Sequence, residues 1–200
     1  MQYGICHLSI VPIRANPEDS TEMVSQLLYG EHFKVLENRK RWSKIRVAHD
    51  RLEGWIHNNQ FTLVSEKDYQ RLDCDSPSLA ADIVSHVCTS GGMLLPVVLG
   101  SVVSGMDVLG HTFEGYATEH QQSKSNLVDT ALLYLNTPYL WGGKTPFGID
   151  CSGFAQMVYK MNGYVLKRDA GQQSQQGEPL SFIEESEPGD LAFLTTMKVS

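Results

Sequence analysis

The 200-residue sequence lacks four features that would assign it quickly to a class of protein. It has no excess of basic residues: 16 Lys and Arg face 23 Asp and Glu, and the net charge of -7 argues against a general nucleic-acid binder. Its longest apolar run, Met93–Leu99, is too short to span a bilayer and contains Pro96, so no membrane span is expected. It has no Cys-x-x-Cys pair, and no histidine lies between Cys151 and Ser200.

The cysteines that are present are too scattered for a metal centre. No two of them have the spacing of a zinc site, and none is grouped with histidines as metal ligands usually are. A chain of this length can bury enough apolar surface to fold without disulfides. We therefore expect reduced thiols, no metal and no cofactor. The cysteines are Cys6, Cys74, Cys88 and Cys151.

The N-terminus shows no secretory signal. The first residues carry no basic region, and His7 and Pro12 interrupt the apolar segment that a signal would need. The expectation is a cytoplasmic protein, although a periplasmic or exported protein with a trimmed signal would look the same.

The first 66 residues predict a small β-barrel. Three segments are rich in β-branched and aromatic residues and partly alternate with polar ones. They are Leu8–Arg14, His32–Glu37 and Trp42–Val47. Turn-forming residues such as Asn-Pro-Glu-Asp at 16–19 separate them. Because a small antiparallel sheet with open edges tends to aggregate, the pattern favours a closed barrel.

Two further segments separate this barrel from the C-terminal part. Residues 67–78 are polar and contain Pro77, which predicts a linker that could hold one helical turn. Residues 79–121 return to a Gly-rich, strand-like texture and could form a second, degenerate copy of the barrel, although no clean repeat is visible.

From residue 122 onward the pattern predicts helices followed by a strand. Asp150 is a candidate N-cap for a helix whose apolar residues recur at i, i+3, i+4 and i+7. These residues are Phe154, Met157, Val158 and Met161. Gly189-Asp190 then leads into Leu191–Leu194, which we predict as a buried strand. The chain as a whole is therefore expected to be α+β.

Cys151 is a candidate nucleophile because it falls in the first turn of that predicted helix. A cysteine attacks as a thiolate, and the unpaired N–H groups and the dipole of a helix N-terminus favour its negative charge. The small Ser152 and Gly153 keep the approach open, and N–H groups of this turn could form an oxyanion hole. From helix position alone, a small buried cysteine is an equal alternative. The preceding Trp-Gly-Gly at 141–143 permits close approach of another chain or a ligand and favours the nucleophile.

Four motifs follow one another in the C-terminal part. They are Tyr-x-Trp-Gly-Gly at 139–143, Asp-Cys-Ser-Gly-Phe at 150–154, Arg-Asp-Ala at 168–170 with Gln173, and Pro-Gly-Asp-Leu at 188–191. In order and spacing they resemble the NlpC/P60 family of cell-wall cysteine peptidases, over residues 122–200. The resemblance implies a papain-like α+β domain, which we expect to be incomplete at its C-terminal end in this chain.

Three N-terminal segments carry a second resemblance, namely Thr21–Gln26, Gly30-Glu31 and Glu53–Ile56. They resemble a bacterial SH3 (SH3b) domain. The combination is similar to the SH3b-bearing dipeptidyl-peptidases that cleave γ-D-glutamyl-diamino acid bonds in peptidoglycan fragments.

The first resemblance implies roles for the residues around the cysteine. Cys151 is implied as the nucleophile, with Asp150 and Ser152 flanking it in the same site. Asp150 is expected to cap and position rather than to activate the thiol. Tyr139 is implied to line the site beside the oxyanion, and Trp141 to shape the substrate groove.

Further substrate contacts are implied farther from the cysteine. Arg168, Asp169 and Gln173 match a pocket-forming segment, in which Ala170 replaces a serine that is common in this branch and so removes one hydroxyl. Glu22 is a candidate for binding the free amine of an N-terminal L-alanine, since a carboxylate suits that charge. A solvated strand or turn residue is the alternative for Glu22.

The resemblance also implies a histidine base downstream of Gly-Asp-Leu, where this sequence has none. His111 and His120 are nearest to Cys151 on its upstream side but match no family position, and His57 could face the substrate entrance. Two explanations are open: the sequence is cut before the base, or a short native chain carries an inactive peptidase half.

The sequence thus predicts a cysteine peptidase that hydrolyses the γ-D-glutamyl-diamino acid bond of peptidoglycan peptides such as L-Ala-γ-D-Glu-diamino acid, in cell-wall turnover or recycling. The alternative is a non-catalytic SH3b protein that binds the cell wall or a peptide. A third option is acyl transfer, in which an amine captures the same thioester.

Overall fold

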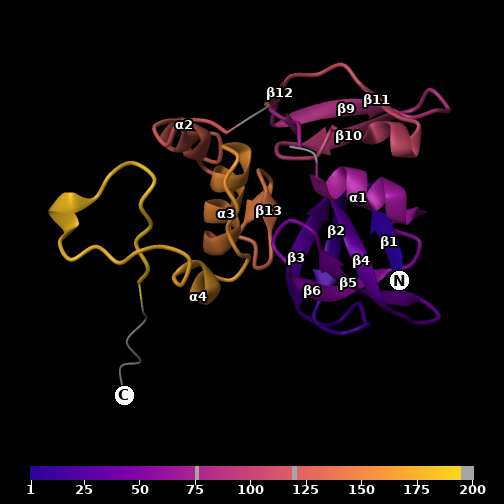
Figure 1. The fold of residues 1–200 in the computed structure, drawn as a ribbon, viewed down its shortest axis with the longest axis horizontal. Helices are drawn as coiled ribbons and strands as arrows, with labels where there is room; N and C mark the ends of the chain where they lie inside the picture. The colour runs from indigo at the N-terminus through magenta and orange to yellow at the C-terminus, as the bar shows by residue number, and fades with distance from the viewer. Residues whose placement is uncertain (75–76, 119–120, 195–200) are drawn as a thin grey trace.

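The computed structural model describes residues 1–74, 77–118 and 121–194. Its helices and strands form three parts in chain order: an N-terminal antiparallel sheet, a small strand unit and a helical part that contains Cys151 (Figure 1). This mixture of helix and sheet confirms the α+β class.

Seven antiparallel strands form the N-terminal part, in the order β3-β2-β6-β5-β4-β1-β7. They are β1 (Gln2–Ile5), β2 (Ile10–Arg14), β3 (Met23–Leu28), β4 (His32–Asn38), β5 (Trp42–Val47), β6 (Glu53–His57) and β7 (Thr62–Val64). Alternate residues of β4 and β5, such as Phe33 and Ile45, point into one apolar core. The predicted strand segments therefore form an SH3-like barrel core, as expected.

The predicted linker at 67–78 contains a helix. Helix α1 (Glu66–Cys74) begins where the Ser65 hydroxyl accepts a hydrogen bond from the backbone N–H of Asp68 at 3.1 Å. The ring of Tyr69 stacks on Tyr3 of β1 with 4.5 Å between centroids. The segment is polar because α1 buries few side chains, Tyr69 among them, and exposes most of the others to solvent.

The second part consists of short strands packed on the barrel. Its elements are β8 (Leu79–Ala80), β9 (Val84–Cys88), β10 (Leu94–Val98), the 3-10 helix η1 (Met106–Leu109), β11 (Thr112–Phe113) and β12 (Ala117–Thr118). The strands β10-β9-β11 form one sheet, and Tyr29 of the barrel is buried in its apolar cluster. That this part is a second SH3b copy stays a prediction.

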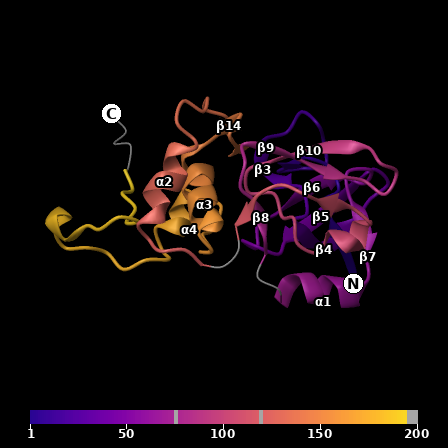
Figure 2. The same ribbon diagram turned by 90° about the horizontal axis from the view of Figure 1, so that it is seen from above.

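The third part holds the helices that position Cys151. Its elements are α2 (Asn126–Leu132), β13 (Lys144–Thr145), β14 (Gly148–Ile149), α3 (Cys151–Met161), α4 (Ala170–Gln173) and the 3-10 helix η2 (Ile183–Glu185). Figures 1 and 2 show α3 between α2 and the barrel, with the yellow C-terminal segment on the side away from the barrel.

One apolar core joins all three parts. It combines Leu28 of β3, Val98 and Leu99 of the second part, and Leu127 and Met157 of α2 and α3. Because α3 buries its inner face against the barrel side of the molecule, the position of its first residue depends on residues far away in the sequence.

The predicted strand at Leu191–Leu194 is wrong. These residues have no regular secondary structure, and Leu194 is almost fully exposed. An apolar run favours a strand only where a neighbouring strand pairs with its backbone, and no such pairing occurs among the described residues.

Candidate active site

Cys151 is the first residue of α3 and is exposed. Asp150 is the N-cap, with an extended backbone, and its Oδ1 accepts from the N–H of Gly153 at 2.7 Å. The predicted cap is therefore confirmed. The thiol therefore lies at the N-terminus of an 11-residue helix.

Two glycines allow the chain to reach this position. Gly142 has φ of 76°, and a Cβ there would lie 2.3 Å from the backbone O of Met23 in β3. A Cβ on Gly153 would lie 2.3 Å from the backbone O of Gly143. The loop at 142–143 therefore approaches β3 of the barrel and the first turn of α3 closely. Both close approaches are made within the same chain.

Asp150 also forms a buried ion pair behind the cysteine. The guanidinium of Arg168 donates to both carboxylate oxygens, at 2.9 and 2.7 Å, and Gly142 N–H donates to Oδ2 at 2.8 Å. Burial alone would raise the pKa of Asp150, but Arg168 and the N–H of Gly153 hold it below its usual value. Asp150 is therefore charged at neutral pH and fixed in place.

Arg168 is buried behind Asp150, and its predicted contact with substrate stays a prediction. It is 4% exposed, and partners account for all five of its N–H donors. Besides the two Asp150 oxygens, these partners are Ser25 Oγ at 3.0 Å, Ser152 Oγ at 2.8 Å and Gly143 O at 3.4 Å. Through these bonds the guanidinium ties Asp150 and Ser152 to the barrel strand β3.

The pocket-forming segment after Arg168 lies beside the first turn of α3. Gln173 Nε2 donates to the backbone O of Ser152 at 2.9 Å and to that of Lys167 at 2.8 Å. Asp169 is exposed and caps α4, accepting from Gln172 N–H at 3.2 Å. Of this segment, the structure places Asp169 at the surface and Gln173 in the interior; their predicted substrate contacts stay predictions.

Three predicted site residues lie at the surface around the loop that precedes Cys151, a group that we call the rim: Glu22, Tyr139 and Trp141. Tyr139 and Trp141 are 67% and 61% exposed. The backbone of Tyr139 bridges to Ile149, which directly precedes Asp150 in the chain. The indole N–H of Trp141 donates to the carboxylate of Glu22, just before β3, at 2.7 Å. The structure therefore brings Glu22 to the cysteine loop from 119 residues away.

Sequence reasoning missed several barrel residues that hold this loop. The backbone N–H of Lys144 donates to Gln26 Oε1 at 2.8 Å. Glu31, in the turn between β3 and β4, accepts from Lys144 Nζ at 3.1 Å and from Lys160 Nζ at 2.6 Å. Gln26 and Glu31 both lie in segments that resemble an SH3b domain, but no local pattern identifies them as contacts of this loop, because their partners lie more than 100 residues away in the sequence.

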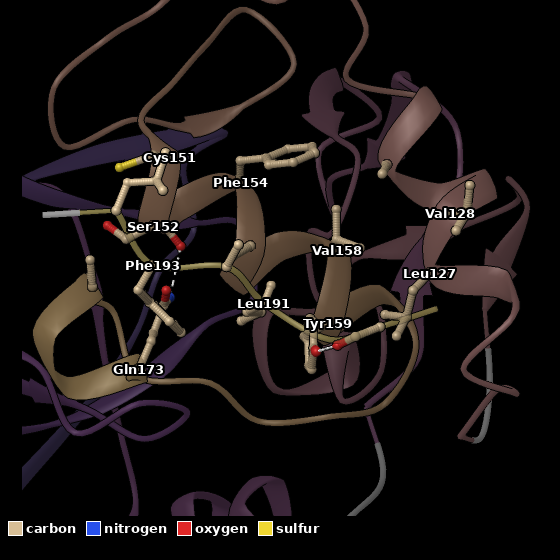
Figure 3. A pocket seen from close by; sticks show the side chains of 16 residues that line it. Leu127, Val128, Cys151, Ser152, Phe154, Val158, Tyr159, Gln173, Leu191 and Phe193 are labelled. Carbon is tan, nitrogen blue, oxygen red and sulfur yellow. Dashed lines mark hydrogen bonds between the residues drawn. The ribbon is translucent and has the colours of Figure 1, made fainter. Parts of the chain in front are cut away.

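A cavity of about 550 Å³ lies beside Cys151, between α2, α3 and the segment 189–194 (Figure 3). Its lining is mostly apolar, with Phe154 and Val158 along the helix and Leu191 and Phe193 across from them. Cys151 and Ser152 lie at one end.

Of the described residues that line this cavity, none is a histidine. His111 instead shares a hydrogen bond of 2.9 Å with Tyr29, and the ring of His57 packs on Trp42. His120 lies outside the described residues. The described residues around the cavity therefore include no histidine that could accept the thiol proton of Cys151. In the described ranges, no three His, Cys, Asp or Glu side chains gather in a way that could hold a metal ion.

Together, the fold and the site define a protein in which an SH3-like barrel holds a helix that begins with an exposed cysteine. A family model described as "NlpC/P60 family" matches residues 136–200, and one described as "Bacterial dipeptidyl-peptidase Sh3 domain" matches residues 13–61. The chain carries a bacterial SH3 domain followed in the sequence by an NlpC/P60 domain, as the sequence motifs predicted.

The named relatives are peptidases. Dipeptidyl-peptidase 6 of Lysinibacillus sphaericus is 28% identical over 215 residues, covering 90% of this chain and 76% of the relative. A gamma-D-glutamyl-L-lysine dipeptidyl-peptidase of Bacillus subtilis (strain 168) is 38% identical over 76 residues, covering 38% of this chain and 25% of the relative. This chain thus matches only a quarter of the second relative's length.

A solved structure shares the fold. The NlpC/P60 family protein from Bacillus cereus superposes with a TM-score of 0.75 over 93% of this chain and 80% of that chain, at 18% identity. Within the described residues, no helix is long and apolar enough to cross a membrane.

Proposed function

We propose that this protein is a cysteine peptidase that hydrolyses the γ-D-glutamyl-diamino acid bond of peptides derived from peptidoglycan. The observation that carries the proposal is the exposed thiol of Cys151 at the capped N-terminus of α3, inside an NlpC/P60 domain. The names of two relatives, both dipeptidyl-peptidases, support the substrate class.

The proposed reaction proceeds through a thioester. The thiolate of Cys151 attacks the γ-carbonyl carbon of D-glutamate, and the N–H groups of the first helical turn receive the oxyanion. The Gly153 N–H is already bound to Asp150, which leaves the N–H groups of Cys151 and Ser152 for this role. The C–N bond then breaks, and the leaving amine takes up the proton that the thiol gave up on forming the thiolate. Water hydrolyses the thioester, which releases the γ-carboxyl group of D-glutamate and regenerates the thiol.

The rim residues support a preference for peptides with a free N-terminus. Glu22 is held beside Trp141 by one carboxylate oxygen, and its charge suits the ammonium group of an N-terminal L-alanine. We place the reaction in the cytoplasm, where recycled wall peptides with free amines would be the substrate.

The test is product analysis by mass spectrometry. The protein is incubated with L-Ala-γ-D-Glu-diaminopimelate and, in parallel, with L-Ala-γ-D-Glu-L-Lys. Release of L-Ala-D-Glu by the protein, together with its loss in Cys151→Ala, is the expected result. Intact peptides after incubation with the full native chain would exclude the peptidase, and capture of the acyl group by an added amine would indicate acyl transfer.

A second candidate function is binding without catalysis. The observation that favours it is the lack of a histidine among the described residues that line the cavity beside Cys151. In that case the peptides bind, with calorimetric heats that Cys151→Ala preserves, and no product appears.

A further inference from the structure

The side chain of Glu31 is buried in the contact between the barrel and the NlpC/P60 domain. Its exposed fraction is 3%, and it lies in the turn between β3 and β4. Its Oε1 accepts from Lys144 Nζ at 3.1 Å and from Lys160 Nζ at 2.6 Å, and its Oε2 accepts from the backbone N–H of Leu28 at 2.9 Å. One barrel carboxylate thus binds two lysines of the other domain.

These two lysines flank the nucleophile in the sequence. Lys144 lies in β13, at the start of the hairpin that leads to Cys151, and Lys160 lies in the last turn of the helix that Cys151 begins. The second anchor of Lys160 is the backbone O of Gly100, at 3.0 Å. The same carboxylate therefore fixes both the approach to Cys151 and the far end of α3.

The composition of this cluster does not fit a role in stability alone. Two ammonium groups and one carboxylate are removed from water together, and apolar side chains of similar size would fill the space with a smaller desolvation cost. A charged cluster of this kind has directional bonds, so it accepts one arrangement of its three elements where an apolar contact would accept several.

Further polar contacts run along the same boundary. Asp50 Oδ2, in the turn after β5, accepts from Gln156 Nε2 of α3 at 2.9 Å, and Ser25 accepts from Arg168 at 3.0 Å. The barrel therefore holds α3 at its middle and at its C-terminal end, and holds the ion pair behind its N-terminus.

We infer that Glu31 is a positioning residue for Cys151: by binding Lys144 and Lys160 it sets the place of the nucleophile loop and of α3, so that the barrel is a working part of the active site. The inference rests on the nucleophile role proposed for Cys151. The inference about Glu31 is tested by the reactivity of the thiol itself, which needs no peptide turnover. The test can therefore be carried out even if the protein shows no peptidase activity.

The experiment measures the rate of Cys151 alkylation by iodoacetamide against pH in the full chain, resolved by peptide mass spectrometry. Glu31→Gln is compared with Ile45→Ala, a barrel-core variant that also lowers stability but touches neither lysine. We expect the Cys151 rate at neutral pH to fall about tenfold in Glu31→Gln, with a displaced pH profile, because a thiol that moves away from a helix N-terminus loses thiolate character. Ile45→Ala is expected to keep the wild-type profile.

A second variant separates the effect on Cys151 from an effect on folding. In the triple variant Glu31→Met, Lys144→Met and Lys160→Met, all three charges are removed together, so the unfolding midpoint is expected to return toward that of the wild type. The inference requires the Cys151 profile to stay displaced in this variant. A wild-type alkylation profile in the triple variant, or the same profile in Glu31→Gln and Ile45→Ala, would overturn it and leave the cluster a structural contact.

Discussion

The indole N–H of Trp141 donates a hydrogen bond of 2.7 Å to the carboxylate of Glu22. The bond joins the rim of the cysteine loop to the barrel, across 119 residues of sequence. It is one of several contacts through which barrel side chains fix the loop and the helix of Cys151. The SH3 domain is therefore in direct contact with the segments that position Cys151.

Replacing Trp141 by Phe removes this bond and keeps an aromatic wall. Because a net hydrogen bond contributes about 1 kcal/mol, kcat/KM for the γ-D-glutamyl peptide is expected to fall roughly fivefold. The bond lies within the protein and the side chain is largely exposed, so the free energy of unfolding should fall by no more than about 1 kcal/mol. Steady-state kinetics and urea unfolding measure the two effects, and a large loss of stability would contradict the rim position.

Glu22→Gln separates charge from hydrogen bonding. The amide oxygen can still accept from Trp141, but the negative charge that would attract an N-terminal ammonium is gone. We expect kcat/KM for L-Ala-γ-D-Glu-L-Lys to fall roughly tenfold, as for other hydrogen bonds to a charged group. The N-acetylated peptide is the matched control, since it has no ammonium group. Equal losses for both peptides would show that Glu22 does not bind the amine.

Arg168→Met is expected to destabilise the fold through the ion pair it breaks. Asp150 would remain buried without its countercharge, a change that typically costs about 3–5 kcal/mol. Urea unfolding measures the loss. Arg46→Met is the matched control, because Arg46 also pairs with a carboxylate, that of Glu53, at an exposed site. Such exposed pairs contribute about 0–1 kcal/mol. Similar losses in the two variants would contradict the buried role of Arg168.

Stability should fall in mild acid because of His49. Burial, with the ammonium groups of Lys160 and Lys144, lowers the pKa of His49 to about 4, while Glu31 and Asp50 act in the opposite direction. An unfolded histidine titrates near 6.5, so between these two values the unfolded chain binds more protons than the folded one. The free energy of unfolding is therefore expected to decrease as the pH falls from about 6.5 to 4, by on the order of 3 kcal/mol.

The variant His49→Gln carries no titrating group at this position. Its free energy of unfolding, measured in urea at several pH values, should fall less steeply between pH 6.5 and 4 than that of the wild type. Some slope remains, because burial also lowers the pKa of His32. An unchanged slope would show that His49 does not titrate in the predicted range.

The sequence was sufficient where the signal is local. Asp150 caps α3 and Cys151 begins it because a short polar side chain before an amphipathic run fixes a helix start without help from the rest of the chain. The barrel strands followed from alternation in the same way. Both domain types were visible in their motifs, and the family models match residues 136–200 and 13–61, which lie within the predicted ranges.

The parts that could not be predicted depend on contacts between distant segments. The burial of Arg168 could not be seen in its motif, because its partners Ser25 and Asp150 come from two domains. Glu31 carries no motif signal for a site, and its role depends on where the barrel meets α3. Leu191–Leu194 was predicted as a strand from its apolar residues, since a sequence pattern does not show whether a pairing strand is present.

The most direct test of the account is covalent labelling of the nucleophile by a substrate-like reagent. The reagent is L-Ala-γ-D-Glu with a diazomethyl ketone in place of the scissile amide, and peptide mass spectrometry locates the adduct among the four cysteines. The account predicts labelling of Cys151 alone, slowed by excess L-Ala-γ-D-Glu-L-Lys. No adduct at Cys151, or an equal adduct at Cys88, would contradict it.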